Sequence, residues 1–235
     1  MNRSYIFCNN INSNDLGLII ENTPEIPTTN FNYDEIEIDG GENLTIRSGF
    51  SDVEFKIDFT YFAEPEEYLM KKQRIDSWLL GNVNKYLIYS LDDFSAYKVK
   101  KVAIDNTTTT SRYVRHFTAT FTCAGLKYLS SGLKPLILTS SGVELNNFGS
   151  YESKPFFKIY GSGNITVNIN GNSFMVKNIS NYVLVDSELK ECYKDSTNMG
   201  KNMTGDYPIL LVGENTISWS GTVTKIELTP RWRCF

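Results

Sequence analysis

The chain has 235 residues, of which 41% are hydrophobic and 21% are charged, and its formal net charge is −4. This balance excludes a disordered or collagen-like protein, and the length suits one large β domain or two smaller ones. The negative charge argues against a nucleic-acid-binding surface of the usual basic kind, although an acidic wall would let DNA slide past without sticking.

The four cysteines show neither the CxxC spacing nor the accompanying histidines of a zinc site. Structural zinc needs four ligands at close pairwise spacing, so we expect no metal and no cofactor. The cysteines are Cys8, Cys123, Cys192 and Cys234. Their disulfide state cannot be read from spacing. The N-terminal segment lacks the features of a signal peptide, and no stretch approaches the roughly 18 apolar residues of a membrane span. We therefore expect synthesis in a reducing cytoplasm.

Alternation of apolar and polar residues predicts short strands in the first part of the chain. Glu35–Asp39 is expected to form a strand with an acidic outer face that ends at Gly40-Gly41. The longest clean alternation follows at Val53–Tyr61, where five apolar side chains share one face. Because side chains along a strand point to opposite faces in turn, this segment is predicted to be half-buried.

A helical period replaces the alternation between Pro65 and Leu80. Pro65 suits the first helical position and Gly81 the C-terminal cap. We expect the apolar stripe of this helix, with Trp78 and Leu79, to cover the N-terminal sheet. The alternative is a contact with another subunit, which makes Trp78 a candidate interface residue.

The middle of the chain predicts more strands and then a linker. Alternation resumes over residues 113–123, where His116, the only histidine, lies on the more polar face. The sequence indicates no nucleophile or carboxylate partner for it, so a solvated surface histidine is favoured over a catalytic one. Turn clusters loosen the pattern over residues 126–147, and we place the linker there. The predicted domains are residues 1–148 and 149–235.

The last third alternates most regularly and contains its own turns. Asn170-Gly171 is typical of a type I′ turn and predicts a hairpin. Gly161–Gly163 and Ser220-Gly221 are predicted to be further turns. A slip of one residue in the alternation predicts a β-bulge near Thr224-Lys225. The chain as a whole is therefore predicted to be mainly β, with an N-terminal sandwich or barrel-like domain carrying one α-helix and a C-terminal antiparallel β-sandwich.

The sequence contains no GxSxG or HExxH motif, and we predict no catalytic residue. The Asp186-Ser187-Glu188 tract could be interpreted as a site for a cation or a sugar. The strand Val183–Val185 ends there, however, and Asp and Ser readily bond their own backbone at such ends, which favours a polar turn. With 27 acidic residues, no glycosidase pair can be assigned.

The C-terminal Arg231, Trp232 and Arg233 form the second candidate interface. Tryptophan and arginine are enriched at the residues that dominate binding energy in protein interfaces. The alternative is a last strand that buries Trp232 in its own domain. The two interpretations can also hold together, with the ring buried and both guanidiniums facing outward. Both interpretations remain open at the level of sequence.

Several short motifs in the last third, taken in order and spacing, resemble the distal tail protein (Dit) family of long-tailed phages. The motif residues are Pro155, Gly161, Ser162, Gly163, Asp186, Ser187, Glu188, Tyr207, Pro208, Gly213, Glu214, Asn215, Trp219, Ser220, Gly221, Arg231, Trp232 and Arg233. The first two thirds resemble the family in the layout of strands and helix rather than in motifs.

The resemblance implies a structural protein of a phage tail tip or baseplate in the virion. It implies a ring, hexameric in this family, formed by N-terminal domains around a channel for DNA, and a galectin-like C-terminal domain. The implied partners are the tail tube protein and the tail-tip or tail-associated lysin protein. The alternative function is a carbohydrate-binding module that attaches to a host surface, an inference that rests on fold analogy alone.

Overall fold

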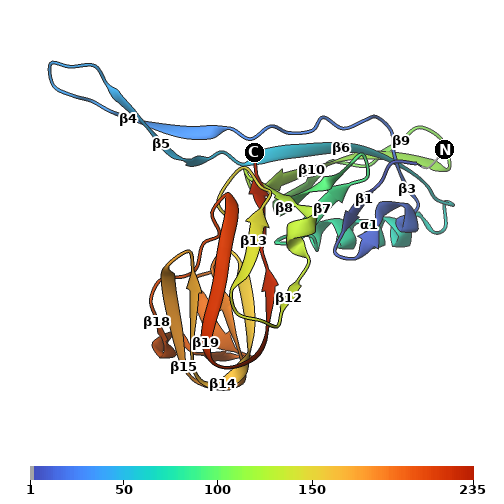
Figure 1. Cartoon of the computed structure of the whole chain (residues 1–235). Coiled ribbons are helices and arrows are strands. Elements are labelled where there is room, and N and C mark those ends of the chain that lie inside the picture. The colour runs from blue at the N-terminus through green and yellow to red at the C-terminus, as the bar shows by residue number, and fades with distance from the viewer. Residues whose placement is uncertain (1–2) are drawn as a thin grey trace. The chain divides into compact units, whose positions relative to one another are not determined.

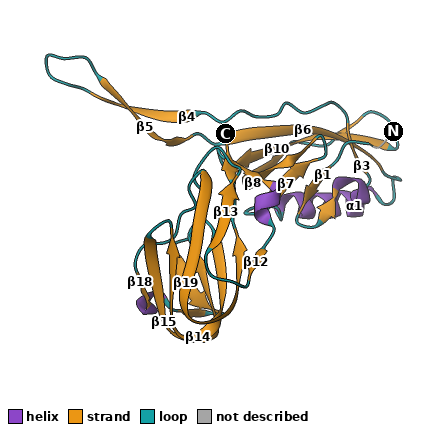
Figure 2. Cartoon of the chain, viewed as in Figure 1, coloured by secondary structure: helices purple, strands orange, loops and turns teal. Residues whose placement is uncertain are grey.

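The computed structural model describes residues 3–235, and it is mainly β with one α-helix among them (Figure 2). This confirms the predicted fold class. Met1 and Asn2, which open the segment considered above as a signal peptide, lie outside the described residues. The chain divides into two compact units: an N-terminal unit that extends to Lys127 and includes Phe235, and a C-terminal unit, Tyr128–Cys234.

The boundary between the units precedes the one predicted between residues 148 and 149. The predicted linker contains β12 (Leu136–Leu138) and β13 (Val143–Asn147), which both pair with β19 (Gly213–Thr229) in the C-terminal unit. Each of these strands buries only one residue fully. Because β12 has three residues and β13 has five, neither is long enough to show the alternation that identifies a half-buried strand.

The N-terminal unit contains one large sheet, one helix and a separate hairpin (Figure 1). Its elements are β1 (Ile6–Cys8), β2 (Ile11–Asn12), a 3₁₀ turn (Ser13–Leu16), β3 (Leu18–Ile20), β4 (Phe31–Ile36), β5 (Leu44–Phe50), β6 (Val53–Phe62), α1 (Tyr68–Leu80), β7 (Tyr86–Tyr89), β8 (Asp92–Ile104), β9 (Thr108–Thr109) and β10 (Val114–Cys123). The strand order in the sheet is β2-β1-β7-β8-β10-β6-β3, with β9 paired to β10.

Strand β6 forms the centre of this unit, as its alternation predicted. Phe55, Ile57 and Phe59 are completely buried, while Glu54 and Lys56 between them are exposed. Its partner β10 pairs with it over its full length, from Val114 opposite Phe62 to Cys123 opposite Val53. The predicted half-buried strand is therefore confirmed.

Helix α1 packs on the same core through Ile75, Trp78 and Leu79, as expected. The helix begins at Tyr68 instead of Pro65. Glu67 occupies the N-cap without a side-chain hydrogen bond to the first turn. Since Ser, Thr, Asp and Asn are the residues that cap a helix well, and none lies between Pro65 and Tyr68, the preceding residues form a turn.

The C-terminal unit contains an eight-stranded sheet around a second core. Its elements are β11 (Lys127–Leu129), a 3₁₀ turn (Ser130–Leu133), β12, β13, β14 (Phe156–Ile169), β15 (Asn172–Asp186), β16 (Glu191–Lys194), β17 (Thr197–Asn198), a 3₁₀ turn (Gly200–Asn202), β18 (Met203–Thr204), β19 and β20 (Arg233–Cys234). The main strand order is β12-β19-β14-β15-β16-β17, with β13 on β19 and β18 on β15.

One predicted turn of this unit is confirmed and two are wrong. Asn170 and Gly171 both have positive φ and join β14 to β15 as a hairpin. Gly161–Gly163 and Ser220-Gly221 lie instead within β14 and β19, where the register between strands shifts. A Cβ at Gly161 would lie 2.1 Å from the carbonyl oxygen of Thr222, so these glycines allow bent, paired strands to approach each other.

The predicted bulge is confirmed. Tyr160 pairs with Lys225 and the next residue, Gly161, pairs with Val223, which leaves Thr224 unpaired on β19. The one-residue slip in the apolar pattern therefore predicted the bulge correctly.

Candidate assembly surface

The β4–β5 hairpin (residues 31–50) is exposed over most of its length. It forms a two-stranded sheet of its own, and in Figure 1 it runs as a ribbon beyond the other strands of that unit. Sequence analysis predicted the strand at Glu35–Asp39. The structure places it at Phe31–Ile36, because Ile36 pairs with Leu44 and residues 37–43 form the connecting turn, with Gly40 at φ 72°.

One face of the hairpin carries a row of exposed apolar side chains. Ile36 lies opposite Leu44, and Ile46, two residues further along β5, lies on the same face. These three side chains are 48%, 51% and 44% exposed, respectively. Ile38 in the connecting turn is also exposed. We call Ile36, Leu44 and Ile46 the apolar row.

The base of the hairpin is anchored by aromatic rings of the same unit. The ring centroids of Phe31 and Phe50 are 5.0 Å apart, and Phe235 lies 5.5 Å from Phe31. The Arg47 guanidinium lies 4.3 Å from the centroid of the Phe31 ring. These contacts hold the base in place and leave the apolar row uncovered.

The turn end of the hairpin is acidic. Asp34, Glu35, Glu37, Asp39 and Glu42 are all exposed. Arg47 is the only basic residue between Phe31 and Phe50. The face that carries the apolar row also carries Asp34, which lies opposite Ile46, and the other carboxylates surround the row toward the turn.

An isolated hairpin of this kind is marginally stable in water, because it buries little apolar surface and leaves both strand edges unpaired. Full burial of a Leu or Ile side chain stabilises by about 1.5–3 kcal/mol relative to exposure. Covering the apolar row would recover roughly half of that value for each half-exposed residue. A surface that covered the apolar row would therefore stabilise the hairpin.

The structure places the predicted interface residue Trp78 inside the N-terminal unit. Its side chain is 7% exposed, and its indole Nε1 donates a hydrogen bond to the Cys8 carbonyl oxygen at 3.3 Å. The predicted packing on the sheet is therefore present, and an additional role at an interface stays a prediction.

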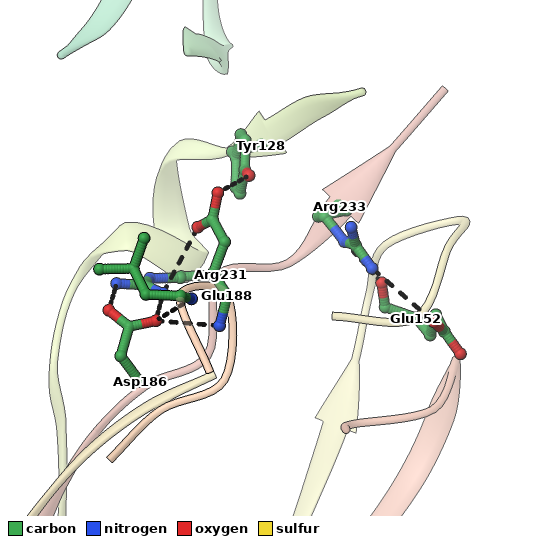
Figure 3. A network of polar contacts seen from close by, with 7 residues as sticks. Tyr128, Glu152, Asp186, Glu188, Arg231 and Arg233 are labelled. Atoms are coloured by element: carbon green, nitrogen blue, oxygen red, sulfur yellow. Dashed lines mark hydrogen bonds and ion pairs between the residues drawn. The ribbon is translucent and has the colours of Figure 1, made fainter. Parts of the chain in front are cut away.

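The predicted interface residue Arg231 is bound within the C-terminal unit (Figure 3). Its two guanidinium nitrogens donate to the two carboxylate oxygens of Asp186 at 2.7 and 2.9 Å. Glu188 lies 3.4 Å from the same guanidinium. Asp186 also accepts backbone hydrogen bonds from Glu188 and Leu189, which confirms the polar turn expected at this tract. The ion pair itself carried no sequence signal, since its partners lie far apart in the chain.

Trp232 is 4% exposed and belongs to the C-terminal core, as one of the two interpretations expected. A Cβ at Gly132 would lie 2.5 Å from the Trp232 backbone nitrogen, so only a glycine fits against this residue. Arg233 donates from Nε to the Glu152 carbonyl oxygen at 2.7 Å. The prediction that both guanidiniums face outward is therefore wrong, because each is bonded inside its own unit.

We predict that Arg231→Met destabilises the C-terminal unit by about 2–3 kcal/mol, because it leaves the Asp186 carboxylate buried without its partner. This is less than the loss of a fully buried pair, since the Arg231 side chain retains 17% exposure. Chemical denaturation measures the difference. The double variant Arg231→Met/Asp186→Leu should be more stable than Arg231→Met alone, and equal stability would contradict this explanation.

The pH dependence of stability should follow the same pair. Burial alone would raise the pKa of Asp186. The hydrogen bond and the positive charge of Arg231 lower it by more than burial raises it, so the pKa lies below the ordinary value of 3.8. Because the pKa is lower in the folded state, the ionised carboxylate stabilises the protein at pH values above the unfolded-state pKa. This stabilisation is lost as the pH falls through the folded-state pKa. Unfolding free energies measured from pH 6 down to about pH 3 should therefore fall more steeply for the wild type than for Asp186→Asn. Parallel curves would contradict this.

His116 is half-buried and bonded rather than fully solvated. Its Nδ1 lies 2.5 Å from Glu21 Oε1 and 2.8 Å from Thr60 Oγ1. The hydrogen bonds from His116 and Thr60 lower the pKa of Glu21. The Thr60 hydroxyl and the Glu21 carboxylate both contact the same ring nitrogen, Nδ1, whereas in a Ser-His-Asp triad the hydroxyl and the carboxylate bond opposite nitrogens of the histidine. The cluster links β6 and β10 to Glu21, the residue that follows β3.

Two further findings concern chemistry. Within residues 3–235, no three His, Cys, Asp or Glu side chains are grouped as metal ligands would be. Burial raises the pKa of Cys8 and Cys123 to about 12, so neither thiol is activated as a nucleophile. In the part of the chain that the structure describes, no helix has the length and apolarity to cross a membrane.

Comparison with known proteins finds no matching family model and no matching curated protein. Among solved structures, the chain is similar to the SPP1 Dit protein, with a TM-score of 0.65 and 12% sequence identity. The match covers 97% of this chain and 98% of that chain. That protein is described as a paradigm of the hub adsorption apparatus in phages that infect Gram-positive bacteria. The likeness shows that this chain has a Dit-like fold, as the sequence resemblance predicted.

Proposed function

We propose that this chain is a structural subunit of a phage tail tip, and that it assembles into a closed ring through its β4–β5 hairpin. The observation that carries the proposal is the apolar row, Ile36, Leu44 and Ile46, exposed on a hairpin that no other strand of the described chain pairs with. The Dit-like fold of the whole chain supports the location at a tail tip.

A second copy of this chain is the proposed occupant of the apolar row. The hairpin is one element of each subunit, so a contact between it and a different surface of the next subunit is a heterologous, head-to-tail contact. Such contacts close into a ring when the rotation between subunits is right, and closure prevents growth into fibres. We propose six subunits, as in the family that the chain resembles.

The ring would join the tail tube protein to the tail-tip or tail-associated lysin protein, with DNA passing through its channel. The acidic net charge of −4 is compatible with passage of DNA without specific binding. The proposal assigns no enzymatic step to this chain. A free-standing carbohydrate-binding module is less well supported, because a monomer would leave the apolar row in water.

The proposal is tested by labelling the chain in phage particles. An antibody against the C-terminal unit, detected by immunogold electron microscopy, should mark a single position at the distal end of the tail. Labels along the whole tail, on the capsid, or absent from purified particles would contradict a tail-tip location.

A further inference from the structure

A cavity opens on the C-terminal unit, and its lining includes Glu152, the residue that Arg233 contacts. Its volume is 380 Å³, within the range of about 300–1,000 Å³ that small-molecule sites occupy. It lies between the β14–β15 turn and the segment from Gly205 to Leu211. The residues that matter for its chemistry are Asn170, Asn172, Asp206, Tyr207 and Ile209.

The walls of this cavity are held in place by a buried asparagine. Asn215 is 1% exposed, and its side chain bonds both the N–H and the carbonyl of Leu211, each at 2.8 Å. The same side-chain oxygen accepts a hydrogen bond from Asn170 Nδ2 at 2.8 Å, and Asn170 Oδ1 in turn accepts from the Thr216 N–H at 2.9 Å. One side chain thus fixes both walls, so the cavity is formed before any ligand arrives.

Gly205 brings the two walls close together. Its φ is 95°, and a Cβ at this position would lie 2.5 Å from the Ser173 carbonyl oxygen. Since no other residue tolerates both the positive φ and the close approach, this glycine fixes where the Asp206-Tyr207 segment crosses β15.

Three polar side chains of the cavity are free to bind a ligand. Within residues 3–235, the side chains of Asn172, Asp206 and Tyr207 form no hydrogen bond or ion pair. Partial burial raises the pKa of Tyr207, so its phenol stays protonated and can donate as well as accept. Together these groups offer a carboxylate acceptor, an amide that donates and accepts, and a phenol.

The charge of the cavity excludes anionic ligands. Asp206 and Glu152 are acidic, and no lysine or arginine of the described chain is among the residues that line it. Glu152 Oε1 lies 3.9 Å from Arg233 Nη2, which leaves Asp206 as the carboxylate without a basic neighbour. A phosphate or an acidic sugar would therefore meet repulsion without compensation.

We infer that this cavity binds a neutral pyranose ring, as a single sugar or as the end of a neutral polysaccharide. Sugar hydroxyls donate and accept at once, and the Asp206, Asn172 and Tyr207 groups match both roles. The apolar face of a pyranose can pack on the aromatic ring of Tyr207 and on Ile209, which is 41% exposed beside it. This goes beyond the structural role proposed above, which does not need the cavity.

Saturation-transfer NMR on the full-length protein tests the inference, using glucose, galactose and N-acetylglucosamine as neutral probes and glucuronic acid as the anionic probe. At least one neutral sugar should receive saturation, and glucuronic acid should not. Asp206→Ala and Tyr207→Leu should each weaken binding about tenfold, as expected for a lost charged hydrogen bond or a lost stacking wall. Asp195→Ala, an exposed carboxylate outside the cavity, should leave binding unchanged.

Absence of saturation for every neutral sugar in the wild type would overturn the inference. It would also be overturned if glucuronic acid bound as well as the neutral sugars, or if both cavity variants bound sugar like the wild type. Thermal unfolding of each variant checks that the fold is retained. Light scattering on the same samples reports the assembly separately, so an empty cavity in an intact ring would refute this inference and leave the proposed function standing.

Discussion

Replacing the apolar row by threonines, as Ile36→Thr/Leu44→Thr/Ile46→Thr, is expected to convert the assembled protein into monomers. Each substitution removes roughly 1 kcal/mol of apolar burial from a subunit contact, since each side chain is about half-exposed in the free chain. Together they weaken each contact by about two orders of magnitude in Kd. Threonine keeps the strand propensity of the hairpin, so the fold of the subunit is retained. Light scattering measures the mass directly.

The control changes apolar residues outside the hairpin that are more exposed than those of the apolar row. Ile137 is 64% exposed on β12 and Leu189 is 60% exposed in the β15–β16 turn. The variant Ile137→Thr/Leu189→Thr should assemble like the wild type. If the hairpin variant also assembles like the wild type, another surface forms the subunit contact and the role of the hairpin is wrong.

Trp78→Ala is expected to lower the free energy of unfolding by about 3–5 kcal/mol, the usual cost of removing a buried tryptophan. The side chain lies in the core between α1 and the sheet, and its truncation leaves a cavity and deprives the Cys8 carbonyl of a donor. Chemical denaturation under conditions in which the subunit is monomeric gives the value without a contribution from assembly.

Leu69→Ala is the control, because Leu69 lies on the same helix and is 73% exposed. Its substitution should change the free energy of unfolding by less than about 0.5 kcal/mol. Similar losses for both variants would mean that the helix as a whole, rather than the Trp78 contact, determines the effect. An unchanged stability of Trp78→Ala would assign the side chain to an interface instead.

The sequence predicted the parts of the fold in which apolar pattern and burial coincide. Val53–Tyr61 and the Asn170-Gly171 hairpin were predicted correctly, because strict alternation and a two-residue turn each have few structural alternatives. The bulge at Thr224 was predicted for the same reason, since a slip in the pattern has to be absorbed in the chain.

Two turn predictions were wrong because glycine motifs occur both in turns and in bulged strands. Gly161 and Gly221 were assigned to turns, but they lie in long paired strands that bend at these points. A glycine motif does not distinguish a chain reversal from a bulge, because both need a residue without Cβ. Only the partner strand, which is distant in sequence, decides between them.

The candidate surface was largely missed for a related reason. Glu35–Asp39 was predicted as a strand with an acidic outer face, which places its apolar residues on the other face. Ile36 and Ile38 are about half-exposed, because the hairpin pairs only with itself. Alternation predicts that one face is apolar, but it does not say what covers that face. Conversely, Arg231 and Trp232 are residue types that are enriched at interfaces, but Arg231 pairs with Asp186 and Trp232 is buried in the core of the same unit.

The mass of the purified full-length protein in solution tests the central claim most directly. One chain has a mass of 26.7 kDa. Light scattering, combined with electron microscopy of the same sample, should give a single closed ring of roughly six times that mass. A stable monomer at every concentration, alone and with the tail tube protein added, would contradict the claim that the β4–β5 hairpin is covered by a second copy of the chain.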